Sequence, residues 1–252
     1  MASLRLLQFT DMHLYGDPGG ELRGVPTLPA FRAAVAHAAR RFPVRDAVLV
    51  TGDLVQDDPD GYQHVRSVLG ASDVPVLCLP GNHDLPDAMA RALDHAPFQI
   101  GGSYGAGAWH LLLLDTWVAN HAGGRLGAEQ IAATEAMLER HADRHVLICL
   151  HHHPISMRSR WLDEVGLEDT AAFLAMLRRH RNVRGVLWGH VHQALDTFVA
   201  GVRFMATPST CTQFLPRSDE FAIDSRPPAY RVLELTADGS IATEIVWADR
   251  RD

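Results

Sequence analysis

The sequence predicts a single α/β domain, and three observations support this prediction. The chain has 252 residues, 47% hydrophobic and 21% charged, so it can bury a full core and has the composition of a globular protein. Short apolar runs alternate with Ala-rich segments of helical period through the first three quarters. The run Leu111–Leu114 has no polar alternation, which is typical of a sheet covered on both faces. Without internal repeats or linkers, one domain is expected over residues 1–252.

The order of elements follows from these patterns. Strands are expected at Leu4–Phe9, Ala47–Val50, Val76–Leu79, His110–Leu114, Val146–Leu150 and Gly185–Trp188. Helices are expected between them at Pro29–Arg41, Asp60–Leu69, Ala128–His141 and Thr170–His180. The last quarter changes to hairpins, with strands at Leu195–Val199, Val202–Ala206, Tyr230–Leu235 and Ile241–Val246.

One long segment, residues 207–228, has no regular pattern and contains several prolines. Loops of this length inside a compact domain are uncommon and usually functional. We therefore expect a lid or substrate loop here, with a surface connection packed by its own side chains as the alternative.

Composition excludes several function classes. The net charge is −7 and every basic residue is Arg, which removes lysine chemistry and argues against nucleic acid as a partner. No apolar run approaches the ~18–20 residues that a membrane span requires. The stretch Leu4–Phe9 is too short for a signal sequence, so a cytoplasmic protein is expected. The three cysteines, Cys78, Cys149 and Cys211, are far apart in the sequence and odd in number, and apolar residues precede Cys78 and Cys149. They are expected as buried thiols in a reducing compartment.

Candidate ligand side chains follow five of the expected strands. They lie in the segments Asp11-Met12-His13, Gly52-Asp53, Gly81-Asn82-His83-Asp84, His151-His152-His153 and Gly189-His190-Val191-His192. Because loops from neighbouring strands converge at the carboxyl ends of an α/β sheet, these groups are expected to form one site.

Spacing and donor chemistry indicate a metal site. Asp11 and His13 are two residues apart, as are His190 and His192, and in an extended segment such pairs point the same way. Glycines precede the ligands at three positions and let the backbone turn sharply. The carboxylate, amide and imidazole donors suit Fe, Mn or Zn, and seven donors are what two ions require.

These motifs, in this order, resemble those of the calcineurin-like metallophosphoesterases. His151-His152-His153-Pro154, Gly189-His190-Val191-His192-Gln193 and the segment 206–211 are similar to the bacterial class III 3′,5′-cyclic nucleotide phosphodiesterases. The resemblance implies a four-layer α/β/β/α sandwich of two mixed β-sheets flanked by helices. It also implies hydrolysis of cyclic AMP to 5′-AMP by attack of a hydroxide that bridges two metal ions. Some relatives pair through segments between the third and fourth motifs, so a homodimer stays open.

The resemblance also implies a ligand set. One ion would be held by Asp11, His13, Asp53 and His192, and the other by Asp53, Asn82, His151 and His190, with Asp53 shared. His151 matches the family position. His152 is expected to point the opposite way in an extended chain, and His153 stands where the family often has proline.

Catalytic and substrate roles are carried over in the same way. His83 would face the substrate and protonate the leaving 3′-oxygen, and Asp84 would orient it. Substrate contacts are implied for His13, Asp53, Asn82, His83 and His192.

Other polar and aromatic residues have simpler interpretations. Asp57 and Asp58 are expected to form a solvated turn before a helix. Trp161 is a candidate for the pocket lining. The remaining helical histidines are expected at the solvated surface: His37, His64, His95, His141 and His180.

The motifs bind phosphate and metal, and they do not select the rest of the substrate. A metallophosphoesterase that acts on a glycerophosphodiester or a 2′,3′-cyclic nucleotide is therefore the main alternative. A nuclease is disfavoured by the acidic balance. A metal-free interaction module on the same fold would have lost ligands, and here the full set is present.

Overall fold

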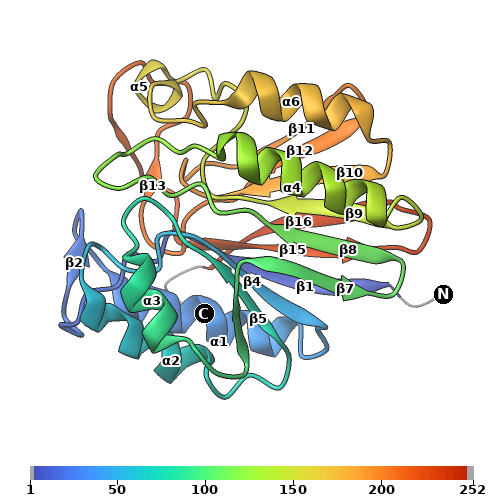
Figure 1. Ribbon diagram of the computed structural model, residues 1–252. Helices are drawn as coiled ribbons and strands as arrows, with labels where there is room; N and C mark the ends of the chain where they lie inside the picture. Colours follow the sequence, from blue (N-terminus) through green and yellow to red (C-terminus); the bar gives the residue numbers. More distant parts are fainter. Residues whose placement is uncertain (1–2, 249–252) are drawn as a thin grey trace.

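A computed structural model describes residues 3–248, so the ends of the domain expected over 1–252 lie outside the described residues. The described chain forms two six-stranded mixed sheets that pack face to face, with helices on both outer sides (Figure 1). The four-layer α/β/β/α arrangement expected from the sequence is confirmed. Within residues 3–248, no helix has the length and apolar character needed to cross a membrane.

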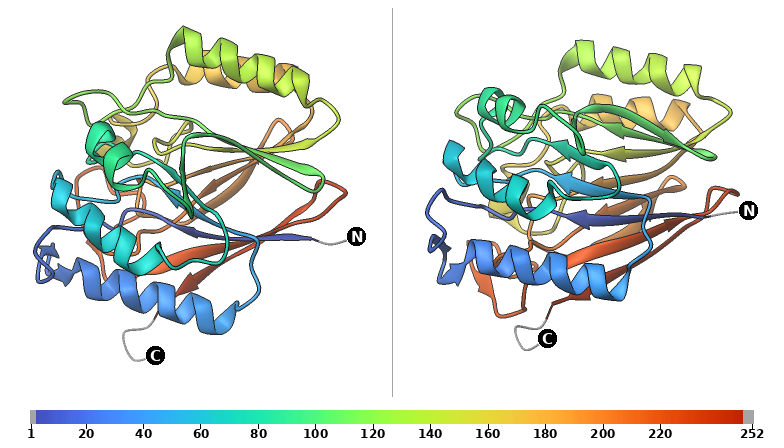
Figure 2. Two further views of the ribbon diagram at one scale, coloured as in Figure 1. Left: turned by 60° about the horizontal axis from the view of Figure 1, so that its bottom comes forward. Right: turned by 90° about the horizontal axis from the view of Figure 1, so that it is seen from below.

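The first sheet has the strand order β16-β15-β1-β4-β5-β6. Its strands are β1 (Leu4–Phe9), β4 (Ala47–Thr51), β5 (Val76–Leu79), β6 (Phe98–Ile100), β15 (Ala229–Leu235) and β16 (Ile241–Trp247). Strands β1, β4, β5 and β6 are parallel, so the loops after them leave from the same end of the sheet. The outer face is covered by α1 (Thr27–Arg41), α2 (Tyr62–Leu69) and α3 (Pro86–Ala92), and the 3₁₀ turn η1 (Pro59–Gly61) leads into α2 (Figure 2).

The second sheet has the order β11-β12-β10-β9-β8-β7. Its strands are β7 (Gly102–Ala106), β8 (Trp109–Leu113), β9 (His145–Cys149), β10 (Val183–Trp188), β11 (Leu195–Val199) and β12 (Val202–Ala206). The helices α4 (Gly127–Arg140) and α6 (Thr170–Arg179) cover its outer face, and the short α5 (Arg160–Asp163) lies at the end of the sandwich (Figure 1).

Apolar side chains alternate between two layers along the central strands. In β8 and just after it, Leu111 and Leu113 belong to the layer between the sheets, whereas Leu112 and Leu114 pack under the helices of the second sheet. Both faces of the strand are thus buried, which explains the unbroken leucine run. Each fully buried leucine contributes roughly 1.5–3 kcal/mol, so these layers hold the strands in place.

Several short elements differ from the expectation. The strands β6 and β7 and the helix α3 were not expected, and the segment 207–228, expected to be irregular, contains the antiparallel pair β13 (Gln213–Phe214) and β14 (Ile223–Asp224). A second short pair, β2 (Glu21–Leu22) and β3 (Val25–Pro26), precedes α1. Elements of two or three residues carry too little periodicity for a pattern to stand out.

The Arg231 side chain of β15 links the two sheets. Its buried guanidinium donates to the carbonyl oxygens of Ala206 and Leu195 in the second sheet, at 2.7 and 3.2 Å. It also donates to the hydroxyls of Thr207 and Thr243 at 2.9 and 3.1 Å. Burial lowers its pKa to about 10, so the group stays charged at neutral pH.

Replacing this link should weaken the fold. We expect Arg231→Met to lower the free energy of unfolding by about 2–4 kcal/mol, because buried oxygens lose their donors. Arg41→Met is the control, since Arg41 forms an exposed ion pair with Glu244 and its loss should change stability by about 0.5 kcal/mol or less. Urea denaturation measures both variants. Equal midpoints would show that Arg231 does not hold the sheets together.

Candidate metal centre

Five strand ends meet at one end of the sandwich, the end where β2, β13 and α5 lie in Figure 1. The first sheet contributes the loops after β1, β4 and β5, and the second contributes the loops after β9 and β10. These loops bring together the side chains predicted as metal ligands: Asp11, His13, Asp53, Asn82, His151, His190 and His192. All of them except Asn82 are buried, with exposed fractions of 8% or less. The site therefore straddles two sheets.

Most of these residues have a left-handed backbone. Positive φ angles occur at Asp11 (55°), His13 (50°), Asp53 (50°), His190 (66°) and His192 (48°). Such a conformation costs on the order of 1–3 kcal/mol per residue and clusters at functional sites. Here Asp11 N–H donates to Gly52 O and His13 N–H donates to Asp53 O, both at 3.0 Å. The side chains of Asp11 and His13, and those of His190 and His192, therefore converge because the backbone bends at each residue. The expectation of an extended segment at these pairs is wrong.

Two constraints, backbone conformation and close packing, require glycine before the predicted ligands. Gly52 has a φ of +94°, a conformation that favours glycine. A Cβ at Gly189 would lie 2.7 Å from Asp11 Oδ2, and one at Gly81 would lie 2.6 Å from His151 Nε2. A Cβ at Gly52 would likewise overlap the His151 ring, so at all three positions the backbone passes directly against predicted ligand side chains and only glycine leaves room.

One group of donors consists of Asp11, His13 and His192. The Nε2 atoms of His13 and His192 are 3.1 Å apart, and His192 Nε2 lies 3.4 Å from Asp11 Oδ1. His192 Nδ1 is 2.7 Å from the carbonyl oxygen of Thr212 and donates to it, which leaves Nε2 as the free acceptor facing the group.

A second group consists of Asp11, Asp53 and His151. His151 Nε2 lies 3.4 Å from Asp53 Oδ2 and 3.2 Å from Asn82 Oδ1, while its Nδ1 lies 2.8 Å from Thr51 O. Asp53 also belongs to a group with His13, whose Nε2 is 3.7 Å from Asp53 Oδ2. The carboxylate of Asp53 thus stands between the two groups.

Burial and neighbouring charges together set the pKa values of these side chains. Burial lowers the pKa of His13 to about 4 and holds the pKa of His190 well below its ordinary value. Burial would also lower the pKa of His151, but the nearby Asp53 carboxylate outweighs it and raises that pKa to about 9. For Asp53, burial acts to raise the pKa, and the His151 ring overcomes it and keeps the pKa well below normal.

These donors fit metal ions. Neutral imidazoles and ionised carboxylates are the ligating forms of His and Asp. Burial favours the neutral rings of His13 and His190, and the His151 ring keeps Asp53 ionised. His151, whose pKa is raised, would release its proton on binding a metal ion. Each group places its ligand atoms within 4.8 Å of one another, and His13 Nδ1 is buried without a hydrogen-bond partner among the described residues. Nitrogen and oxygen donors without a thiolate suit Fe, Mn or Zn.

His83 lies beside the site, but its carboxylate neighbour is not the expected one. Asp57 Oδ2 is 2.8 Å from His83 Nδ1, and Gln56 Nε2 is 2.9 Å from it. Burial lowers the pKa of His83, but the carboxylates of Asp53 and Asp57 outweigh it and raise the pKa. Asp57 lies in the solvated turn expected before the helix, with 62% of its side chain exposed, and the sequence did not indicate its contact with His83.

Asp84 instead supports the backbone. Its carboxylate accepts hydrogen bonds from Gly81 N–H (2.9 Å), Leu54 N–H (3.2 Å) and the hydroxyl of Tyr62 (2.9 Å). Burial and the charge of Asp53 raise the pKa of Asp84 to about 7. The expectation that Asp84 orients the His83 ring is corrected, since these contacts tie the β4 and β5 loops together.

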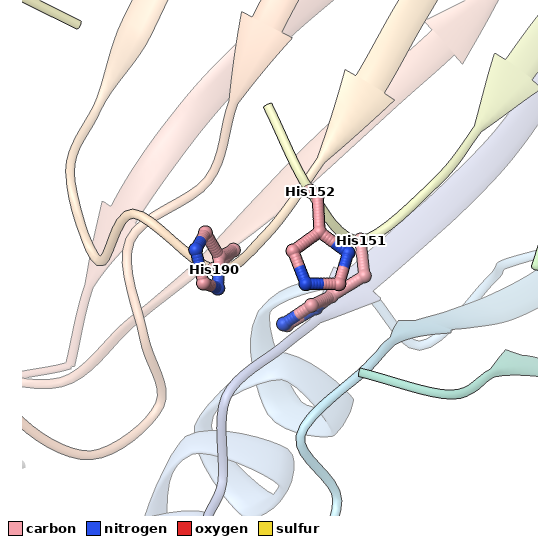
Figure 3. A group of neighbouring side chains, drawn as sticks. All are labelled: His151, His152 and His190. Atoms are coloured by element: carbon pink, nitrogen blue, oxygen red, sulfur yellow. The ribbon is translucent and has the colours of Figure 1, made fainter. Parts of the chain in front are cut away.

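The second histidine of the triplet also differs from the expectation. His152 does not point away: its ring centroid lies 4.7 Å from that of His190 and 4.9 Å from that of His151. Figure 3 shows the rings of His151 and His152 together, with His190 opposite. Strand β9 ends at Cys149, so the alternation of an extended chain no longer applies to these residues. Thr116 Oγ1 lies 2.7 Å from His152 Nδ1, and His152 Nε2 is buried without a partner among residues 3–248.

The segment 207–228 adjoins the site. Ser209 Oγ donates to Asp11 O at 2.6 Å, and the Phe214 ring stacks on the His192 ring with centroids 4.0 Å apart. Elsewhere, His64 is buried against Gly16 O at 3.0 Å and not solvated as expected. The three cysteines are free and buried, as predicted.

Residues 4–194 match the family of calcineurin-like phosphoesterases, and the chain belongs to this family. It is similar to the 3′,5′-cyclic adenosine monophosphate phosphodiesterase CpdA of Vibrio vulnificus, with 39% identity over 245 residues, 96% of this chain and 89% of the relative. The CpdA of Escherichia coli is 37% identical over 246 residues, 97% of this chain and 90% of the relative. A 3′,5′-cyclic-nucleotide phosphodiesterase of Nostoc is 33% identical, covering 96% of this chain and 91% of the relative.

Solved structures share the fold. A dimetal phosphatase from Danio rerio has a TM-score of 0.66 and 18% identity, and the match covers 98% of this chain and 99% of that one. A purple acid phosphatase from yellow lupin has a TM-score of 0.69 and 14% identity, covering 100% of this chain and 52% of the lupin chain.

The packing at Gly189 gives a test of the centre. We expect Gly189→Ala to lower the free energy of unfolding by about 1–3 kcal/mol and to weaken Mn²⁺ binding, because the added methyl would overlap the side chains of Thr10 and Asp11 and displace them. Gly105→Ala in β7 is the control, since its nearest contact would be 3.4 Å. Thermal unfolding and calorimetric titration with Mn²⁺ measure both. Unchanged Mn²⁺ affinity in Gly189→Ala would contradict the close packing.

Proposed function

We propose that this protein is a metal-dependent phosphodiesterase that hydrolyses 3′,5′-cyclic AMP to 5′-AMP. The observation that carries the proposal is the overlap of buried donor groups, with Asp53 belonging both to a group with His13 and to a group with His151. An arrangement of two adjoining cation sites with a shared carboxylate suits the anionic phosphodiester. The relatives described above support the choice of substrate.

The overlapping donor groups support the ligand assignment that the family resemblance implies. We assign Asp11, His13, Asp53 and His192 to one ion, and Asp53, Asn82, His151 and His190 to the other. When bound, such ions offset the phosphate charge and lower the pKa of water toward ~7. These donors suit Fe, Mn or Zn, and we propose Fe or Mn as the ions with Zn as the alternative.

A histidine of this chain protonates the leaving group. Hydrolysis adds water across the bond between phosphorus and the 3′-oxygen, and that oxygen needs a proton as it leaves. His83 supplies it: its ring centroid is 5.3 Å from that of His13, at the edge of the centre, and the raised pKa of His83 favours the protonated ring. Asp57 accepts from His83 Nδ1, so Nε2 is left to face the substrate. Together with His83, the phosphate contacts are assigned to His13, Asp53, Asn82 and His192.

The other phosphodiester substrates use the same phosphate chemistry. A glycerophosphodiester or a 2′,3′-cyclic nucleotide would meet the same donors, so only the products separate these functions. A metal-free interaction module has less support, because the buried histidines and aspartates would then cost stability without serving chemistry.

Product analysis tests the substrate. With Mn²⁺ present, we expect purified protein to convert cyclic AMP to 5′-AMP at a catalytic efficiency well above that for bis(p-nitrophenyl) phosphate. EDTA should abolish both reactions, because the phosphate charge is then not offset. Turnover of the generic diester without 5′-AMP would keep the metal centre and remove cyclic AMP as the substrate.

A second test addresses the Asp57–His83 pair. We expect Asp57→Asn to lower kcat about 10- to 100-fold with the bound metal content unchanged, since the imidazolium loses its partner. Asn also tolerates the left-handed backbone at this position, where φ is 53°. The control is Asp94→Asn, which alters the equivalent surface pair with His95, also at 2.8 Å. If both variants retain full kcat, Asp57 does not position His83 for proton transfer.

A further inference from the structure

Three aromatic side chains form a cluster beside the candidate metal centre. Trp161 comes from α5, Phe214 from β13, and Phe221 from the turn between β13 and β14. Their ring centroids are 5.2 Å apart for Trp161 and Phe214, 5.2 Å for Trp161 and Phe221, and 5.3 Å for Phe214 and Phe221. All three contacts are edge-to-face, so the rings form one continuous apolar surface.

This aromatic cluster is continuous with the metal ligands. The Phe214 ring stacks on His192 with centroids 4.0 Å apart and an interplanar angle of 5°. From His192 the surface passes to Phe214 and then outward to Phe221 and Trp161. Figure 1 shows β13 and α5 at the end of the sandwich where the strand loops meet.

The outer part of the cluster is open to solvent. The exposed fraction of Phe221 is 44%, and the neighbouring Leu215 and Ile223 are 44% and 46% exposed. These three residues are half of the exposed large apolar side chains within residues 3–248. The other three are Val44, Phe198 and Val199. Exposed apolar surface that adjoins a polar site is typical of ligand binding.

The Arg23 side chain borders the aromatic cluster at Phe221. The Arg23 guanidinium, at the turn between β2 and β3, lies 5.0 Å from the centroid of the Phe221 ring. Aromatic rings and guanidinium planes are the surfaces on which nucleobases stack. A phosphate at the metal centre would therefore have an aromatic and cationic surface within reach of the base attached through its ribose.

We propose that the cluster of Trp161, Phe214 and Phe221, with Arg23, binds the base of the nucleotide. The inference rests on the proposed function and adds the residues that distinguish a nucleotide from other phosphodiesters. Stacking depends on a π-face and not on a hydrogen-bond pattern, so the cluster favours a purine ring over a glycerol or other base-free group.

The test separates base binding from phosphate chemistry. We expect Phe221→Ala to raise KM for cyclic AMP about 5- to 150-fold with kcat within about twofold, because it removes one stacking ring. Kinetics on the base-free methyl riboside 3′,5′-cyclic phosphate should not change, and Phe221→Tyr should restore the KM for cyclic AMP. Phe198→Ala is the matched control: Phe198 is 67% exposed and has an arginine 5.6 Å from its centroid, but it is on the edge strand β11.

Each outcome has a distinct meaning. Equal losses on both substrates would show a structural role and overturn the proposal, as would an unchanged KM. A change in oligomeric state without a change in KM would show that the cluster is an interface between copies. If wild-type protein turns over the base-free substrate but not cyclic AMP, the proposed function fails, and that result does not depend on any variant.

Discussion

The burial of two carboxylates, Asp11 and Asp53, constrains everything at this end of the molecule. A buried charge without partners costs several kcal/mol, so each oxygen needs donors. Asp11 accepts from the backbone N–H of His190 at 3.0 Å, and Asp53 accepts from that of His83 at 2.8 Å. Because His190 follows a strand of the second sheet, the bond to Asp11 joins the sheets. The groups that would hold metal ions therefore also fix the relative position of the strands that carry them.

The strained backbone at the ligands depends on the layers behind it. Left-handed residues persist only where their surroundings determine them, and here each follows a strand buried on both faces. The layer between the sheets contains Leu6, Leu49 and Leu187, all fully buried. These leucines anchor β1, β4 and β10 between the sheets, so the loops that follow have little freedom to relax. Rigid supports of this kind hold donor side chains in a fixed arrangement.

The sequence predicted the strands that carry ligands because their apolar runs are long enough to stand out and end in polar motifs. It did not predict the neighbours across loops. Asp84 follows His83 in the chain, yet its carboxylate serves backbone N–H groups, whereas Asp57 reaches the ring from the β4 loop. Contacts between loops depend on how two strand ends face each other, and local spacing does not encode this. The strand β7 was missed for another reason: its glycines and small residues have low strand propensity.

The difference between strand ends, which the sequence predicts, and contacts between loops, which it does not, explains why the motifs indicate the reaction better than the substrate. Metal donors must come from rigid strand ends, and these leave a clear pattern in the sequence. The rim is built from two-residue strands, and its aromatic cluster joins residues 161, 214 and 221, whose spacing follows no secondary-structure period. Such loops can change without disturbing the buried layers, so one phosphate centre can serve different esters. The aromatic rim is therefore where the choice between a nucleotide and another phosphodiester is expected to be made.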